Sequence, residues 1–269
     1  MQYDDFQFLK FDRLADGVLL ITLNRPEVMN ATNARMHWEL TKIWAVVNDD
    51  PDVKVAVVTG AGERAFSAGG DLGWVEQMVG NPEVVATVMK EAGDIVYNML
   101  ACDKPIISAI NGVAVGAGLA VALLADVSLM AETARFTDGH ARLGVAAGDH
   151  AAIVWPLLCG VAKAKYYLMT ADFIDGKEAE RLGLVTFCVP KEALMDKTLE
   201  VAARLARGSQ TAIRATKKSI NNWMRAAGPI FDNSLAMEML GFLGADAREG
   251  LEAIRGKREP DFPSARYSR

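Results

Sequence analysis

The first part of the chain alternates short apolar runs with a longer amphipathic stretch. Residues 6–13 and 18–23 are rich in apolar side chains and are separated by the turn signal Asp16-Gly17, which predicts a β-hairpin. Residues 33–48 then repeat apolar side chains every three or four positions, as one face of a helix does. The chain therefore opens with two strands and a helix.

Three further short apolar runs, at residues 53–59, 105–110 and 127–130, predict buried strands. A helix is expected from about residue 82 to residue 100. Residues 113–125 are almost entirely apolar but too short to cross a bilayer, so a buried helix is the best interpretation. This part of the chain thus continues the mixture of strands and helices.

Helical patterns dominate the rest of the chain. Residues 192–207 place apolar side chains on one helix face, and a further helix is expected over residues 211–224. Strand and helix units followed by helices alone predict an α/β core with a helical C-terminal part. We divide the chain into a core, residues 1–200, and a helical region, residues 201–269.

Composition excludes several classes of protein. The 269 residues are 51% hydrophobic and 23% charged, and the net charge of −5 argues against a nucleic-acid binder. Cys102, Cys159 and Cys188 are far apart and form no Cys/His cluster, so neither a metal site nor a disulfide framework is predicted. The N-terminus lacks the basic and apolar segments of a signal peptide. We expect a cytoplasmic protein without membrane or nucleic-acid partners.

Two glycine-containing loops carry the candidate chemistry. In residues 65–74 (AFSAGGDLGW), Gly69 and Gly70 follow a predicted strand and let the backbone approach a ligand closely. In residues 111–119 (NGVAVGAGL), a loop leads into a helix, whose first turn has unpaired N–H groups and favours negative charge. Together they could direct two N–H groups at one oxygen, as an oxyanion hole. The alternative is that both loops only make turns, since neither has the spacing of a nucleotide-binding loop.

Six segments of the chain occur in the order typical of one family. They are LNRPEVMNA (23–31), AFSAGGDL (65–72), KPIISAINGVAVGAGLAVALLADV (104–127), ARFTDGHARLGVAAGD (134–149), GLVTFCVP (183–190) and EGLEAIRGKREPDF (249–262). Together they resemble the crotonase superfamily, the enoyl-CoA hydratases and isomerases, over nearly the whole chain. The resemblance implies an α/β spiral of strand–strand–helix units and a C-terminal helical region that builds trimers, often paired into hexamers. It also implies a coenzyme A thioester as substrate and no prosthetic group.

The resemblance assigns the two oxyanion N–H groups to Gly70 and Ala117. Only the backbone is used, so alanine is chemically acceptable at position 117 if the turn keeps its shape. The segment from Arg25 to Val28 would lie along the coenzyme A phosphates and pantetheine, although Arg25 could equally be a solvent-exposed arginine. The first glycine loop would frame the adenine and the thioester arm through Ala68, Gly70 and Leu72, with Asp71 beside them in the coenzyme A site.

The chain departs from the family at its acid/base positions. Typical hydratases of this family use two glutamates, and these positions hold Ala120 and His140 here. His140 is the first candidate for proton transfer, because imidazole titrates near neutral pH; it could instead position substrate or hold a loop. Asp149 is the second, because a carboxylate in an apolar stretch could have a raised pKa. The alternative for Asp149 is a helix N-cap.

Residues 148–156 (GDHAAIVWP) resemble the β-diketone hydrolase branch of the superfamily, which includes 6-oxocamphor hydrolase. The oxyanion-region histidine of that branch would fall at Ala117, and His37, near another of its histidines, is better explained as a structural residue. Three functions therefore remain. The first is an acyl-CoA enzyme of the hydratase/isomerase type, the second a β-diketone carbon–carbon hydrolase, and the third a non-catalytic acyl-CoA binding protein.

Overall fold

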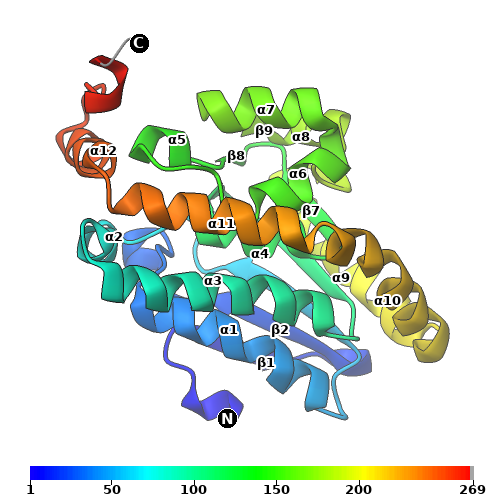
Figure 1. Ribbon diagram of the computed structural model, residues 1–269. Helices are drawn as coiled ribbons and strands as arrows, with labels where there is room; N and C mark the ends of the chain where they lie inside the picture. Colours follow the sequence, from blue (N-terminus) through cyan, green and yellow to red (C-terminus); the bar gives the residue numbers. More distant parts are fainter. Residues whose placement is uncertain (267–269) are drawn as a thin grey trace.

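The computed structural model describes residues 1–266 and contains two β-sheets surrounded by helices (Figure 1). The larger sheet has six strands, in the spatial order β1 (Leu9–Arg13), β2 (Val18–Leu23), β3 (Val55–Gly60), β5 (Ile106–Ile110), β7 (Val127–Ala131) and β10 (Phe187–Val189). The smaller sheet has four, in the order β4 (Ala65–Ser67), β6 (Val113–Val115), β8 (Arg135–Thr137) and β9 (Ile174–Asp175).

The chain visits the two sheets alternately. Strands β3, β5 and β7 lie side by side in the larger sheet, and each is followed directly by a strand of the smaller sheet, β4, β6 and β8. Neighbours pair in parallel within both sets, so each return needs a crossover connection. Every residue of β3 and β5 is buried, as expected for parallel strands covered on both faces. The result is a spiral of strand–strand–helix units.

Helices of very different length connect and cover these strands. Their bounds are α1 (Ala34–Asp49), α2 (Leu72–Met78), α3 (Pro82–Ala101), α4 (Gly116–Leu124), α5 (His140–Leu143), α6 (Ala151–Cys159), α7 (Val161–Thr170), α8 (Gly176–Leu182), α9 (Leu194–Arg207), α10 (Gln210–Ala226), α11 (Gly228–Phe242) and α12 (Ala245–Gly256). Within residues 1–266, none of them combines the length and the apolar character that a membrane-crossing helix requires.

The predicted elements agree with the structure except at a few boundaries. The hairpin β1–β2 is antiparallel, and the helices expected from positions 33 and 82 are α1 and α3. The stretch 113–125 is not one helix, because its first three residues form β6 before α4 begins at Gly116. Gly116 has φ +51°, a left-handed conformation that suits glycine and allows the sharp turn from strand to helix. Helix α2 was not predicted, since it is short and begins inside the first glycine loop.

Helix α11 returns the C-terminal part of the chain to the core. Figure 1 shows it crossing the molecule between α3 and the α5–α7 group, with α10 at one end and α12 at the other, and it packs on α3 and α6. Its buried side chains include Phe231, Leu235 and Phe242. The division at residue 200 falls inside α9, and the assignment of residues 201–269 to subunit contacts stays a prediction.

Candidate active site

The two glycine loops lie side by side, as the sequence predicts. A Cβ atom built on Gly69 would lie 3.3 Å from the Val115 side chain, and one on Gly116 would lie 3.6 Å from the Cα of Gly69. Gly69 has φ +90°, which again favours glycine. Gly118 is also required, because a Cβ there would lie 2.3 Å from the Cβ of Ser67. Small residues therefore bring the start of α4 against the first loop.

The N–H groups assigned to an oxyanion hole are unused by the protein. Around Gly70, Thr32 donates its N–H to the carbonyl of Gly69 over 2.7 Å, and Asp71 donates its N–H to the carbonyl of Thr32 over 2.9 Å. Ala117 is the second residue of α4, where the N–H has no intrahelical acceptor. Within residues 1–266 the N–H groups of Gly70 and Ala117 have no hydrogen-bond acceptor.

A cavity of about 290 Å³ opens beside these loops. The first loop, the start of α4 and the segment from Thr137 into helix α5 form most of its wall, and residues of α2 and α12 and Phe173 add to it. Its lining residues are Ala68, Gly69, Gly70, Leu72, Val75, Val115, Gly116, Thr137, Asp138, Gly139, His140, Arg142, Leu143, Phe173 and Ile254. The cavity therefore joins Gly70 and Gly116, the first residue of α4, to His140, whereas Ala117 is not among the residues that line it.

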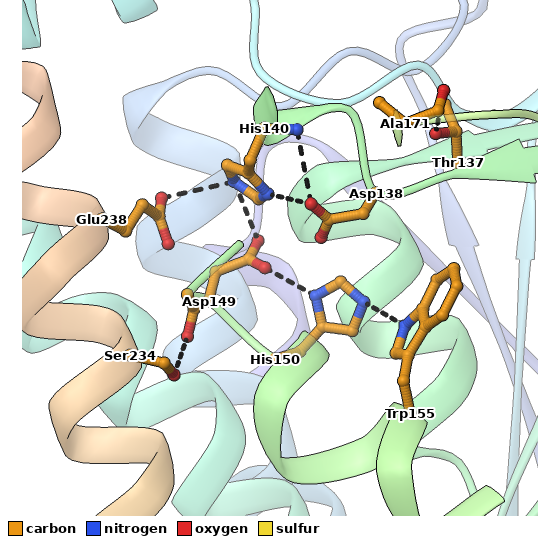
Figure 2. Close-up of polar contacts among 10 residues, drawn as sticks. Thr137, Asp138, His140, Asp149, His150, Trp155, Ala171, Ser234 and Glu238 are labelled. Atoms are coloured by element: carbon orange, nitrogen blue, oxygen red, sulfur yellow. Dashed lines mark hydrogen bonds and ion pairs between the residues drawn. The ribbon is translucent and has the colours of Figure 1, made fainter. Parts of the chain in front are cut away.

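His140 is the first residue of α5 and contacts three carboxylates (Figure 2). Its Nδ1 lies 2.9 Å from Oδ1 of Asp138, and its Nε2 lies 3.3 Å from Oε1 of Glu238 and 3.9 Å from Oδ2 of Asp149. Ionised carboxylates only accept, and Asp138 and Asp149 place one such acceptor near each ring nitrogen, so the surroundings favour the imidazolium form of His140. Burial disfavours this charge, but Asp138, Glu238 and Asp149 outweigh it and hold the pKa of His140 well above 6.5.

Asp149 makes its shortest contact with the neighbouring His150. Its Oδ1 lies 2.5 Å from Nδ1 of His150, and the indole N–H of Trp155 points at Nε2 of the same ring over 3.4 Å. Because an indole only donates, we assign the proton of His150 to Nδ1, from where it bonds Asp149.

Both earlier interpretations of Asp149 are wrong in their physical detail. Burial does favour a raised pKa, but the contacts with His150 and His140 outweigh burial, and the pKa of Asp149 lies below its ordinary value. Asp149 is also not the N-cap of α6, because His150 occupies that position. The residue lies in the cluster beside His140, but as a firmly ionised carboxylate.

Glu238, which the sequence reasoning missed, is a carboxyl group of this cluster with a raised pKa. It projects from α11 and is 4% exposed. Burial raises the pKa of Glu238 to about 7, although His140 opposes this rise. A signal was present in the sequence, since Glu238 lies on the same apolar helix face as Phe231, Leu235 and Phe242. An acidic residue within such a repeat is buried and needs a partner.

Arg25 is neither solvent-exposed nor free. Its guanidinium lies 3.2 Å from the carboxylate of Asp71 and donates to the carbonyl of Ala31 over 2.5 Å, and its side chain is 13% exposed. Asp71 in turn caps α2 by accepting the N–H of Gly73 over 3.0 Å. Arg25 thus holds the first glycine loop, and its contact with coenzyme A stays a prediction, as does that of the exposed Val28.

The remaining candidates have structural surroundings. His37 is buried in α1, where its Nδ1 lies 2.7 Å from Glu91 and its ring packs 4.9 Å from that of Trp74, as expected for a structural histidine. Ala120 is buried inside α4. Helix α4 therefore brings no acid/base group at residue 120, where the family resemblance leads us to expect a glutamate.

The cluster also has the composition of a cation site, since Asp138, His140 and Asp149 present ligand atoms within 4.8 Å of one another. In the structure both nitrogens of His140 already face carboxylates at ion-pair distance. A metal ligand needs a ring nitrogen without a proton, whereas this arrangement favours a proton on each. We therefore interpret the cluster as a proton-binding network.

Comparison with known proteins identifies the family. The model of the enoyl-CoA hydratase/isomerase family matches residues 13–265. Crotonyl-CoA hydratase from Syntrophomonas wolfei is 32% identical, covering 98% of this chain and all of the relative. The structure is similar to an enoyl-CoA hydratase/isomerase from Mycobacterium paratuberculosis, with a TM-score of 0.87, 31% identity and coverage of 92% and 99%. A β-diketone hydrolase from Anabaena, bound to (S)-3-oxocyclohexyl acetic acid, gives a TM-score of 0.83, 26% identity and coverage of 90% and 96%. This chain, with its crotonase fold, belongs to the enoyl-CoA hydratase/isomerase family.

Proposed function

We propose that this enzyme forms and protonates an enolate at the α-carbon of an acyl-CoA thioester. In the proposal, the N–H groups of Gly70 and Ala117 hold the thioester oxygen, and His140 carries the proton. The observation that carries it is the single cavity shared by the first glycine loop, the start of α4 and His140. The family supports the thioester substrate, which brings coenzyme A as part of the substrate and requires no prosthetic group.

Electrostatics support the first half of the proposal, in which two backbone N–H groups hold the thioester oxygen. An enolate oxygen carries a full negative charge, whereas the carbonyl oxygen of the substrate does not. Two unpaired N–H groups, one of them in the first turn of a helix, stabilise the charged form more. Such groups lower the barrier because they are already oriented before the charge develops.

The second half of the proposal, proton transfer by His140, depends on the two positions where hydratase glutamates are expected. His140 stands where one of the two hydratase glutamates is expected, and Ala120 stands at the other position. A single acid/base group suffices for a proton that leaves and returns on one side of the substrate, as in isomerisation. Hydration would need a second group to activate water, and the carboxylates around His140 are the nearest ones.

The test is hydrogen exchange at the α-carbon in heavy water, followed by mass spectrometry over a panel of saturated and unsaturated acyl-CoAs. Ala117→Pro removes one N–H at a position in the first helical turn where proline is tolerated, and should slow exchange by about 10²–10³-fold. Ala117→Gly keeps the N–H and is the matched control. Equal slowing in both variants would refute the oxyanion assignment. Binding of acyl-CoAs with no exchange by the wild type would favour the non-catalytic alternative.

A second candidate function is the hydrolysis of a carbon–carbon bond in a β-diketone. The buried contacts among Asp149, His140 and His150 favour it, together with the likeness to the Anabaena hydrolase. Ala117 counts against it, since the resemblance expects a histidine there. Turnover of a cyclic 1,3-diketone, lost in Asp149→Asn, would replace the first proposal with this one.

We also propose that residues 201–269 supply contacts between subunits, in a trimer or a dimer of trimers. Helices α10 and α11 support this, because they expose large apolar side chains, including Ile220, Trp223, Ile230 and Leu240. Light scattering should give a trimer or hexamer mass for the wild type. Trp223→Asp, with its 72% exposed indole removed, should dissociate the assembly; a monomeric wild type would exclude the proposal.

A further inference from the structure

Helix α11 is fixed against the loop that carries Asp149. Ser234, one turn before Glu238, donates its hydroxyl to the carbonyl of Gly148 over 3.0 Å. A Cβ atom on Gly148 would lie 2.3 Å from the carbonyl oxygen of Ser234 and 2.6 Å from the Cβ of Glu238. This close approach directs the Glu238 side chain at His140 (Figure 2). The packing of α11 against the loop at Gly148 therefore fixes the contact between Glu238 and His140.

The cluster holds more negative than positive charge when its acids are ionised. Three carboxylates, those of Asp138, Asp149 and Glu238, surround the ring of His140, and the one other histidine in Figure 2, His150, contacts Asp149. Burying uncompensated carboxylates is costly, because no water solvates them. One further proton, bound to a carboxylate, lowers this cost.

The hydrogen bonds decide which carboxylate takes that proton. Asp138 accepts both the backbone N–H and the ring Nδ1–H of His140, at 3.3 and 2.9 Å, although its Oδ2 is left without a partner. Asp149 accepts from His150 at 2.5 Å. Glu238 has only the contact of 3.3 Å with His140, and its buried Oε2 has no partner. Fewer donors stabilise the ionised form of Glu238, so it binds a proton most readily.

We propose that Glu238 is a positioning residue that holds a proton at neutral pH and shares it with His140, so that the pair controls when His140 can accept a proton from substrate. This inference rests on the proposed function of His140. Glu238 acts through His140, since it does not line the cavity. When Glu238 is protonated and His140 is an imidazolium, the pair can only donate a proton. After the pair loses one proton, the proton that remains can lie on Glu238, and the neutral ring of His140 can then accept a proton from substrate.

The charged neighbours of the pair are few. Asp138, Asp149 and His140 face Glu238. His150 contacts Asp149 directly, and His37 on α1 acts on Asp149 at longer range. None of them has the weak hydrogen bonding that marks Glu238. A change in the pH dependence of proton transfer on removal of Glu238 is therefore the specific signature of the proposal.

The kinetic test compares the pH profile of α-proton exchange in the wild type and in Glu238→Gln. The wild-type rate should rise with pH through about 7, as the pair loses its first proton. Glu238→Gln should move this rise upward by about one pH unit or more, because glutamine resembles protonated Glu238 and leaves only His140 to lose a proton, while Asp138 and Asp149 still hold the pKa of His140 high. Asp232→Asn, on the same helix and bonded to Tyr97, is the control and should keep the wild-type profile. An unchanged profile in Glu238→Gln would overturn the proposal.

Infrared spectroscopy tests the proton without any turnover. The wild type at pH 6 to 7 should show the carbonyl stretch of a protonated carboxyl group, lost as the pH is raised and absent from Glu238→Gln. If that variant does not fold, Glu238→Asp should keep the band but titrate at another pH. Absence of a band that titrates in the wild type would refute the assignment. If the wild type catalyses no α-exchange, the proposed function fails, while the infrared result still decides where the proton lies.

Discussion

Replacing Glu238 by glutamine should change how the stability of this protein depends on pH. Glutamine keeps the size of the side chain and can still contact His140, but it cannot ionise. The pKa of Glu238 rises from the ordinary 4.5 to about 7 in the folded protein, because the carboxyl group is buried. The folded state of the wild type therefore binds this proton over a pH range in which the unfolded state has lost it.

The sign and size of the effect follow from proton linkage. Between pH 4.5 and 7 the folded state carries more protons than the unfolded state, so the free energy of unfolding falls as pH rises. At about 1.4 kcal/mol per pKa unit, the loss approaches roughly 3 kcal/mol by pH 7. Glu238→Gln lacks this loss, so its stability relative to the wild type should increase by up to that amount across the same range.

His140 and Asp149 titrate outside most of this window. His140 has a pKa well above 6.5 in the folded state, so the stability it contributes is present below 6.5 and is lost as pH rises through its folded pKa. Asp149 has a lowered pKa, so its contribution is present above 3.8 and is lost as pH falls further. The range from pH 4.5 to 6.5 therefore reports mainly on Glu238.

The assay is urea unfolding of the wild type, Glu238→Gln and Asp232→Asn at several pH values, followed by circular dichroism. The difference between Glu238→Gln and the wild type should grow with pH, while Asp232→Asn should run parallel to the wild type. Parallel curves for all three proteins would mean that Glu238 is ionised in the folded state at pH 5, and would refute the reasoning.

Three further predictions concern other parts of the site. His140→Gln should slow α-proton exchange by about 10²–10⁴-fold without preventing acyl-CoA binding by calorimetry, because it removes the proton carrier and leaves the oxyanion loops; unchanged exchange would exclude His140. Gly148→Ala should lower the free energy of unfolding by about 1–3 kcal/mol, since its Cβ would overlap Ser234, whereas Gly256→Ala, with no atom closer than 3.6 Å, should not. Arg25→Gln should lower the free energy of unfolding by about 1–3 kcal/mol, because it removes the largely buried contacts with Asp71 and the carbonyl of Ala31, and should weaken coenzyme A binding if the predicted phosphate contact exists.

Local patterns in the sequence were enough for much of the fold. The apolar runs before and after the turn at Asp16-Gly17 became β1 and β2, because alternation, turn residues and β-branched content act over a few neighbouring positions. The two glycine loops were likewise visible, since glycine at a strand end marks a backbone that other residues cannot adopt. Gly116 shows the limit of this reasoning, because the apolar composition of residues 113–125 hid the strand that precedes it.

The ionisation of the site was decided only by the tertiary structure. Position in the motif pointed to His140 and Asp149, but the direction of each pKa depends on charges brought together from separate elements. Glu238 arrives from α11, far along the chain, and no local pattern states that its partner is His140. For Arg25 the sequence offered a coenzyme A phosphate or solvent, and only the structure shows its ion pair with Asp71; the phosphate contact stays a prediction. Secondary structure follows from neighbours in the chain, whereas pairing and proton affinity follow from neighbours in space.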